Sequence, residues 1–166
     1  MTGLLVAATW DKRDWRRWFD DVSPIVESAI AVSLLQHVAK FSVAQQRPFV
    51  HYAAPGTHTP DVDDNSSFWS GHTSLAFSLA VSAGVVADER GYAVAPAVWI
   101  TGLTLATATG YLRVAADKHY ASDVIVGALM GSAVGVAWPK LFRRDLLAHD
   151  VAISPTPNGI AVAGSF

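Results

Sequence analysis

Hydrophobic residues along this chain gather into four long runs that are separated by polar stretches. The runs cover residues 24–46, 72–87, 93–112 and 119–138, and the third contains twenty consecutive uncharged residues. Apolar runs of this length with few charges are typical of helices that pack against one another. Because short connections between long helices favour antiparallel neighbours, the pattern predicts an all-α fold, an up-and-down helical bundle.

Local signals indicate where these helices begin and end. Ser23-Pro24 indicates a helix start, with Ser as the N-cap and Pro in the first helical position. Arg47-Pro48 is expected to end that helix. The polar segment 48–69 follows, and a loop of this length in a compact domain is usually functional. Near the end of the chain, two β-prone runs flank Pro157-Asn158-Gly159, which predicts a short C-terminal β-hairpin.

We expect a single domain with a core at 23–142, an amphipathic segment at 1–22 and a tail at 149–166. Residues 10–21 mix aromatic with basic residues, which suits a membrane–water interface or a surface helix that rests its Trp side on the core. Residues 2–9 are apolar, but the stretch is short and no basic residue precedes it. We therefore do not expect a signal peptide there.

Composition narrows the classes of function. The chain has 166 residues, of which 51% are hydrophobic and 16% charged, so disorder is excluded and a membrane location stays open. A net charge of −2 provides no basic field, and we expect no nucleic-acid partner. The chain has no cysteine, which excludes disulfides and thiolate chemistry.

Polar residues with chemical potential lie where the predicted helices end. In an up-and-down bundle, alternate helix ends share one side, so these residues are expected to meet at one mouth. They are Lys40 and Arg47 at the C-terminal end of the first predicted helix, Ser70, Gly71 and His72 at the N-terminus of the second, Arg113 at the end of the third, and His119 with Asp123 at the start of the fourth.

Such a mouth would bind an anion. Lys40, Arg47 and Arg113 would repel one another unless an anion joined them, and guanidinium groups match tetrahedral oxyanions. Ser70 at a helix start adds a hydroxyl, free backbone N–H groups and the positive end of the helix dipole. Gly71 lets the backbone approach the anion closely.

A histidine nucleophile is the chemistry that this mouth predicts. His119 and Asp123 are four residues apart, hence neighbours on one helix face. A carboxylate on one imidazole nitrogen would fix the tautomer and leave the other nitrogen as the nucleophile. His72 would then be free to protonate a leaving oxygen as a general acid.

Taken singly, these residues also have simpler explanations: cations near a helix C-terminus, a capping histidine, or a His–Asp pair that is a surface hydrogen bond or two metal ligands. Zinc needs three or four ligands, and three nearby cations would oppose a dication, so no metal site is expected. His51, His58 and the acidic residues at 61–64 are expected to be solvated loop residues.

Together the residues resemble the three-part signature of the type 2 phosphatidic acid phosphatase (PAP2) superfamily, which shares its site with the vanadium haloperoxidases. The three parts stand here as Lys40-FSVAQQ-Arg47-Pro48, Trp69-Ser70-Gly71-His72 and Leu112-Arg113-VAADK-His119-YAS-Asp123. Their order and spacing match throughout. Trp69 replaces the proline and Leu112 the serine of the family pattern, which puts in doubt the loop shape near Trp69 and one hydrogen bond near Arg113.

The resemblance implies that His119 attacks phosphorus to form a phosphohistidine, that Asp123 orients His119 and that His72 protonates the leaving group. The three cations, Ser70 and the backbone of Gly71 would bind the phosphate. The implied activity is metal-independent hydrolysis of phosphate monoesters or diphosphates, with a lipid phosphate or a small phosphate ester as substrate. No cofactor is implied, and vanadate is expected to inhibit.

Two alternatives from other classes remain. A vanadate-dependent haloperoxidase would use the same cage to hold vanadate as its cofactor, although by resemblance those enzymes are much longer and shield the site with extra elements. A non-catalytic phosphate- or lipid-binding envelope protein would keep only the cage. We expect an exported periplasmic or cell-envelope protein that is soluble or peripherally attached, with a compact integral membrane protein as the alternative.

Overall fold

The computed structural model describes residues 15–142, 152–156 and 159–163. Within these residues the helices are α2 (Trp15–Val43), α3 (Pro48–His51), α4 (Gly71–Glu89), α5 (Ala95–Ala115) and α6 (Ala121–Leu141). The strands β1 (Ala152–Thr156) and β2 (Gly159–Ala163) pair antiparallel. The predicted all-α bundle and its C-terminal hairpin are therefore both confirmed.

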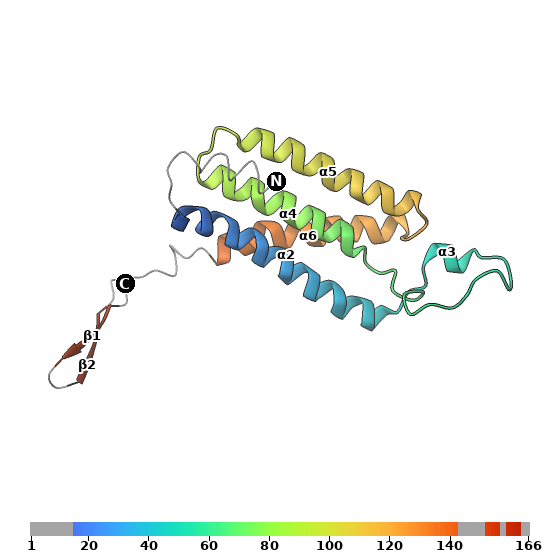
Figure 1. Ribbon diagram of the computed structural model, residues 1–166, viewed down its shortest axis with the longest axis horizontal. Helices are drawn as coiled ribbons and strands as arrows, with labels where there is room; N and C mark the ends of the chain where they lie inside the picture. The colour runs from blue at the N-terminus through green and yellow to red at the C-terminus, as the bar shows by residue number, and fades with distance from the viewer. Residues whose placement is uncertain (1–14, 143–151, 157–158, 164–166) are drawn as a thin grey trace.

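Helix α4 is the central element of the bundle (Figure 1). It contacts α2, α5 and α6, and every residue from Ala80 to Ala87 is buried. The hydrophobic core lies in the half of the bundle where α4 ends and α5 begins. Its buried members are Ile25, Ala83, Val86, Ala87, Ala95 and Val98.

Small residues let α4 and α6 approach each other closely. Gly127, Gly131 and Gly135 recur at four-residue intervals on α6, and each faces a backbone carbonyl of α4. A Cβ added at Gly131 would lie 2.2 Å from the Ser74 carbonyl oxygen, and the corresponding distances at Gly127 and Gly135 are 2.8 and 2.9 Å. This small-residue contact fixes the start of α6 against the start of α4.

The predicted boundary at Ser23-Pro24 is wrong, because α2 begins at Trp15 and runs through Pro24. Asp21 gives the physical reason. Its buried carboxylate accepts hydrogen bonds from Arg90 Nε at 2.6 Å and from Tyr92 OH at 2.5 Å. These contacts with the α4–α5 connection hold the turn before Pro24 in the bundle, so tertiary packing overrides the local capping signal. Residues 15–22 therefore belong to the first long helix.

Large apolar side chains cover the outer faces of α2, α5 and α6. Examples that are at least half exposed are Ile30, Leu34, Val38, Phe41, Ile100, Leu105, Ile125 and Leu129. Two described segments, Arg17–His51 and Ala121–Leu141, are long and apolar enough to cross a membrane by length and composition. The polar or small side chains of Ser28, Thr73, Ser78 and Ser82 are buried instead.

Candidate active site

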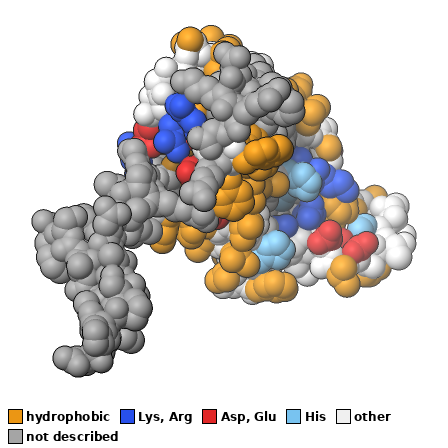
Figure 2. Space-filling model, turned by 60° about the vertical axis from the view of Figure 1, so that its left-hand side comes forward, with side chains coloured by type: hydrophobic (Ala, Val, Ile, Leu, Met, Phe, Trp, Pro, Cys, Tyr) orange, Lys and Arg blue, Asp and Glu red, His pale blue; other side chains and the backbone are white. Residues whose placement is uncertain are grey.

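The predicted mouth exists at one end of the bundle. The end of α2, the short helix α3, the start of α4 and the turn between α5 and α6 lie together there, on the right of Figure 1. Figure 2 shows Lys, Arg and His side chains gathered in one patch of this surface, with hydrophobic side chains beside them. We call the three basic residues Lys40, Arg47 and Arg113 the cation cage.

Arg47 binds the loop at 48–69, which lies at this end of the bundle. Helix α2 ends at Val43 rather than at residue 46, so Arg47 lies beyond it as the N-cap of α3. Its side chain is buried and donates hydrogen bonds from Nε to the Asp63 carbonyl at 2.9 Å and from Nη2 to Ser66 Oγ at 3.1 Å. A longer bond of 3.4 Å runs from Nη1 to the Lys118 carbonyl. Arg47 thus joins the loop to the α5–α6 turn.

His119 is held with one ring nitrogen free. The residue is only 2% exposed, and its Nδ1 lies 2.8 Å from the Ser67 carbonyl oxygen. Because a carbonyl oxygen can only accept, Nδ1 must carry the proton of the neutral ring. The lone pair of the neutral imidazole is therefore on Nε2, which is the nitrogen available for attack.

Burial and positive charge keep the His119 ring neutral. Burial lowers its pKa most, and the charges of Arg47, Arg113 and Lys40 lower it further to about 3, against a smaller upward effect of the Ser67 carbonyl. An imidazole with this pKa is unprotonated at neutral pH and can act as a nucleophile. All three residues of the cation cage therefore lie close enough to His119 for their charges to lower its pKa.

Asp123 contacts the nucleophile through Ser67 and not directly. Its fully buried Oδ2 accepts from Ser67 Oγ at 2.5 Å and from the Tyr120 N–H at 3.1 Å, and it lies 3.8 Å from His119 Nδ1. The predicted Asp123–His119 hydrogen bond is therefore replaced by a relay. The reason is that α6 begins at Ala121, so His119 precedes the helix and the four-residue helical neighbourhood does not apply.

His72 completes the group of titratable residues in the site. It lies in the first turn of α4, is exposed, and interacts electrostatically with Arg113, Lys40 and Arg47. The structure thus brings both predicted histidines to the cation cage. An exposed ring beside a buried one is the arrangement that a general acid and a nucleophile need.

Ser70 and Gly71 lie at the site end, and each has a structural role there. The Ser70 hydroxyl is fully buried and accepts from the Thr73 N–H at 3.4 Å, with Thr73 Oγ1 at 2.8 Å. It therefore caps α4. A Cβ added at Gly71 would lie 2.9 Å from the Gln36 side chain, so glycine leaves room for that amide.

Gln36 is a polar residue that the sequence analysis missed. It is buried one turn before Lys40 on α2, and its Nε2 has no hydrogen-bond partner within the described part of the chain. Arg113 Nε is a second buried donor without a partner among these residues. Buried donors normally find an acceptor, so both suit an oxyanion bound in the cage. The four-residue spacing of Gln36 and Lys40 could have indicated this position.

The loop at 48–69 carries a pair that was expected to be solvated. Asp64 is buried, and its Oδ2 lies 2.8 Å from His58 Nε2 and accepts from the Asp61 N–H at 3.0 Å. These two contacts, the backbone N–H first, lower the pKa of Asp64. No group of three or more His, Asp and Glu in the described residues is arranged to hold a metal ion.

Comparisons with known proteins agree with this geometry. The sequence profile of the PAP2 superfamily matches residues 22–146. The lipid A 1-phosphatase of Porphyromonas gingivalis is 36% identical over 107 residues, which are 63% of this chain and 23% of that protein. The undecaprenyl-diphosphatase of Sulfolobus acidocaldarius is 33% identical over 108 residues, which are 65% of this chain and 48% of that protein. The matched region thus spans less than half of either relative, and no solved structure matches the chain.

Proposed function

We propose a function from one premise, which is that this chain belongs to the PAP2 superfamily. The proposed function is metal-independent hydrolysis of lipid phosphates through a phosphohistidine. One observation carries the proposal. His119 is neutral, has its Nε2 lone pair free, and lies within electrostatic range of three cations. A nucleophilic nitrogen beside an anion-binding cage is the arrangement that phosphoryl transfer needs.

The cation cage binds the phosphate group in this proposal. Arg47 and Arg113 supply planar guanidinium donors, and Lys40 adds a compact charge. Two buried donors, Gln36 Nε2 and Arg113 Nε, have no acceptor within the described residues and can donate hydrogen bonds to the phosphate. Because the site is partly buried, these contacts are stronger than they would be in water.

In the first step, His119 Nε2 attacks phosphorus and the bond from phosphorus to the leaving oxygen breaks. Burial and the charges of Arg113, Lys40 and Arg47 lower the pKa of His72 in the free site. The bound phosphate offsets these charges, so that His72 is protonated in the complex. His72 gives this proton to the leaving oxygen, and the leaving group departs as an alcohol or as a phosphate. The proton of His119 stays on Nδ1 and is donated in a hydrogen bond to the Ser67 carbonyl oxygen, which stabilises the positive charge that forms on the ring. The product of this step is a phosphohistidine.

In the second step, water attacks the phosphohistidine and the phosphorus–nitrogen bond breaks. His72, now neutral, takes a proton from the water, which restores its starting state and that of His119. Inorganic phosphate leaves the cage. The cycle needs no oxidant and no second substrate besides water.

A lipid phosphate is the substrate class that the relatives support. One relative is named as a lipid A 1-phosphatase and the other as an undecaprenyl-diphosphatase. Both names describe removal of phosphate from an amphiphile. The apolar outer surfaces of α2, α5 and α6 fit a substrate of this kind, because such a substrate is found in a membrane.

The same surfaces favour an integral membrane location over the soluble one that the sequence analysis preferred. Large apolar side chains point outward while serine and glycine fill the helix contacts, which is typical of helices in lipid. Basic residues also flank the bundle end opposite the site, at Arg17, Arg90 and Lys140 and in the adjoining sequence at Lys12, Arg13, Arg143 and Arg144. Since such residues stay on the cytoplasmic side, the site is expected to face outward.

A hydrolysis assay tests the activity. The full chain in detergent is expected to release phosphate from phosphatidate or a prenyl diphosphate in the presence of a chelator, and vanadate is expected to inhibit it. His119→Ala should lower kcat by at least about 10³-fold, because the phosphohistidine cannot form. The control is His51→Ala, which changes an exposed histidine of α3. Full activity of His119→Ala would overturn the proposal.

A further inference from the structure

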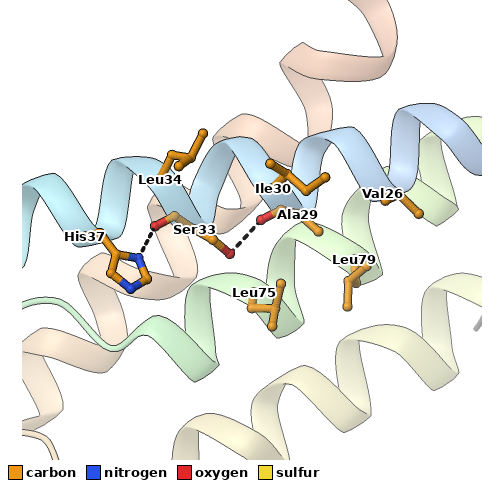
Figure 3. A pocket seen from close by; sticks show the side chains of 8 residues that line it. All are labelled: Val26, Ala29, Ile30, Ser33, Leu34, His37, Leu75 and Leu79. Carbon is orange, nitrogen blue, oxygen red and sulfur yellow. Dashed lines mark hydrogen bonds between the residues drawn. The ribbon is translucent and has the colours of Figure 1, made fainter.

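A groove on the outer surface of the bundle adjoins the site and has no role in the chemistry above. It lies between α2 and α4 and has a volume of about 430 Å³ (Figure 3). Its lining residues are Val26, Ala29, Ile30, Ser33, Leu34, His37, Leu75 and Leu79. Apart from Ser33 and His37, these side chains are aliphatic.

The two polar side chains of the groove are satisfied within their own helix. Ser33 Oγ donates to the Ala29 carbonyl at 2.7 Å, and His37 Nδ1 lies 2.7 Å from the Ser33 carbonyl (Figure 3). The Ser33 hydroxyl therefore needs no partner from an occupant, and His37, at the end of the groove nearest Lys40, is exposed, so that water can bind its other ring nitrogen. The groove presents a surface that fits an apolar chain and not a polar ligand.

The groove leads directly to the cation cage. On α2, Lys40 lies three residues after His37 and seven after Ser33, so it continues the same helix face. On α4, His72 lies three residues before Leu75 and seven before Leu79, again on one face. His72 and Lys40 are within electrostatic range of each other. The apolar stripe thus ends at the phosphate site.

We propose that this groove binds the hydrocarbon chain of the phosphate substrate while its phosphate group lies in the cation cage. The inference rests on the proposed function and adds a chain-binding subsite to it. From His37 to Val26 the groove follows α2 for about 16 Å, at 1.5 Å per residue. Cationic groups at one end and aliphatic walls along the rest match an amphiphile with one charged end.

The experiment measures chain-length preference. The full chain in one non-ionic detergent is assayed with butyl phosphate and dodecyl phosphate, which share the same head group. The wild type is expected to prefer the dodecyl ester in kcat/KM by at least about tenfold, because added methylenes are buried in the groove. Ala29→Trp fills the middle of the groove and is expected to reduce that preference to about twofold or less.

A second variant and a matched control make the result decisive. Val26→Trp obstructs only the far end, so it is expected to reduce the preference for hexadecyl over octyl phosphate while the preference for octyl over butyl remains. Leu129→Trp places the same side chain on the outer face of α6, where Leu129 is 65% exposed, and should keep the wild-type preferences. Val26 is itself 45% exposed, so this variant is expected to fold even if Ala29→Trp does not.

The outcomes separate the two proposals. Hydrolysis of both esters by the wild type without chain-length preference, or preferences that stay unchanged in Val26→Trp, would overturn the groove assignment and leave the phosphatase intact. Failure of the wild type to hydrolyse any of these esters or phosphatidate would overturn the phosphatase itself.

Discussion

At the scale of single residues, Ser67 connects the nucleophile to its buried carboxylate. Its carbonyl oxygen accepts from His119 Nδ1, and its hydroxyl donates to Asp123 Oδ2. One residue therefore fixes both the tautomer of the ring and the position of the carboxylate. Ser67 is a positioning residue in this arrangement, because no atom of it needs to touch the phosphate.

Ser67→Ala is expected to lower kcat by about 10- to 100-fold with little change in KM, because a charge-assisted hydrogen bond to a buried carboxylate contributes about 1.5–3 kcal/mol. The carbonyl that holds His119 remains in this variant, so only the relay to Asp123 is lost. Ser67→Thr keeps the hydroxyl and should restore most of kcat. Steady-state kinetics on phosphatidate measures both. An unchanged kcat in Ser67→Ala would remove the hydroxyl from the mechanism.

The positions of the site residues at the predicted helix ends were enough to predict that they meet at one end of the bundle. The positions of Lys40, His72 and His119 follow from helix ends alone, because an up-and-down bundle places alternate ends together. The direct Asp123–His119 bond could not be predicted correctly, since it depends on whether α6 begins before or after His119. Nor could Ser67, whose contacts span fifty-two residues to His119 and fifty-six to Asp123 with no periodic pattern between them.

At the scale of elements, the contact between α4 and α6 sets the geometry of the mouth. Gly127 packs on the carbonyl of Ser70, and the Ser70 N–H donates to the Asp123 carbonyl at 3.1 Å. The start of one helix is therefore bonded to the start of the other. Closer to the middle of the bundle, Gly131 makes the tightest of the three glycine contacts on α6.

Gly131→Ala is expected to destabilise the bundle by about 2 kcal/mol, because the new methyl group would overlap the Ser74 backbone and the helices would have to separate. A lower Tm of the purified chain in detergent is the measurement. Ala133→Leu adds a larger group on the exposed face of α6 and should change stability by about 0.5 kcal/mol or less. Equal melting temperatures for Gly131→Ala and the wild type would mean that the contact is loose.

Helix boundaries were the part of the fold that sequence patterns predicted least well. Ser23-Pro24 carries a strong local start signal, yet α2 continues through it, because Asp21 is bound to Arg90 and Tyr92. These partners are sixty-nine and seventy-one residues away, beyond the reach of any local rule. The number and order of long helices, in contrast, depend only on apolar runs and were predicted correctly.

At the scale of the whole molecule, the distribution of apolar and basic residues distinguishes the two ends of the bundle from its apolar sides. Apolar side chains lie on the outer faces of α2, α5 and α6, and Arg17, Arg90 and Lys140 lie at the end that is opposite the cation cage. Under the proposed function, these two features support a membrane orientation with the site outside. The substrate would then reach the site from the outer leaflet.

Single cysteines test this orientation, because the chain has none of its own. Val62→Cys lies in the loop at the site end, where Val62 is 99% exposed, and Ala93→Cys lies at the opposite end. A membrane-impermeant maleimide is expected to label Val62→Cys in intact cells and Ala93→Cys only after lysis. Carbonate washing of the membranes should leave both variants in the pellet. Release by carbonate would support a peripheral protein, and the reverse labelling pattern would invert the orientation.

The packing of Gly127, Gly131 and Gly135 on α4 has a consequence for how this molecule could be altered. Small side chains specify which helices touch, and the large apolar ones mostly meet the surroundings. The residues that determine helix packing and the residues that face the surroundings are therefore largely different ones. Under the proposed membrane location, a water-soluble derivative would require polar replacements on the outer faces alone, with the helix–helix contacts and the site residues left as they are.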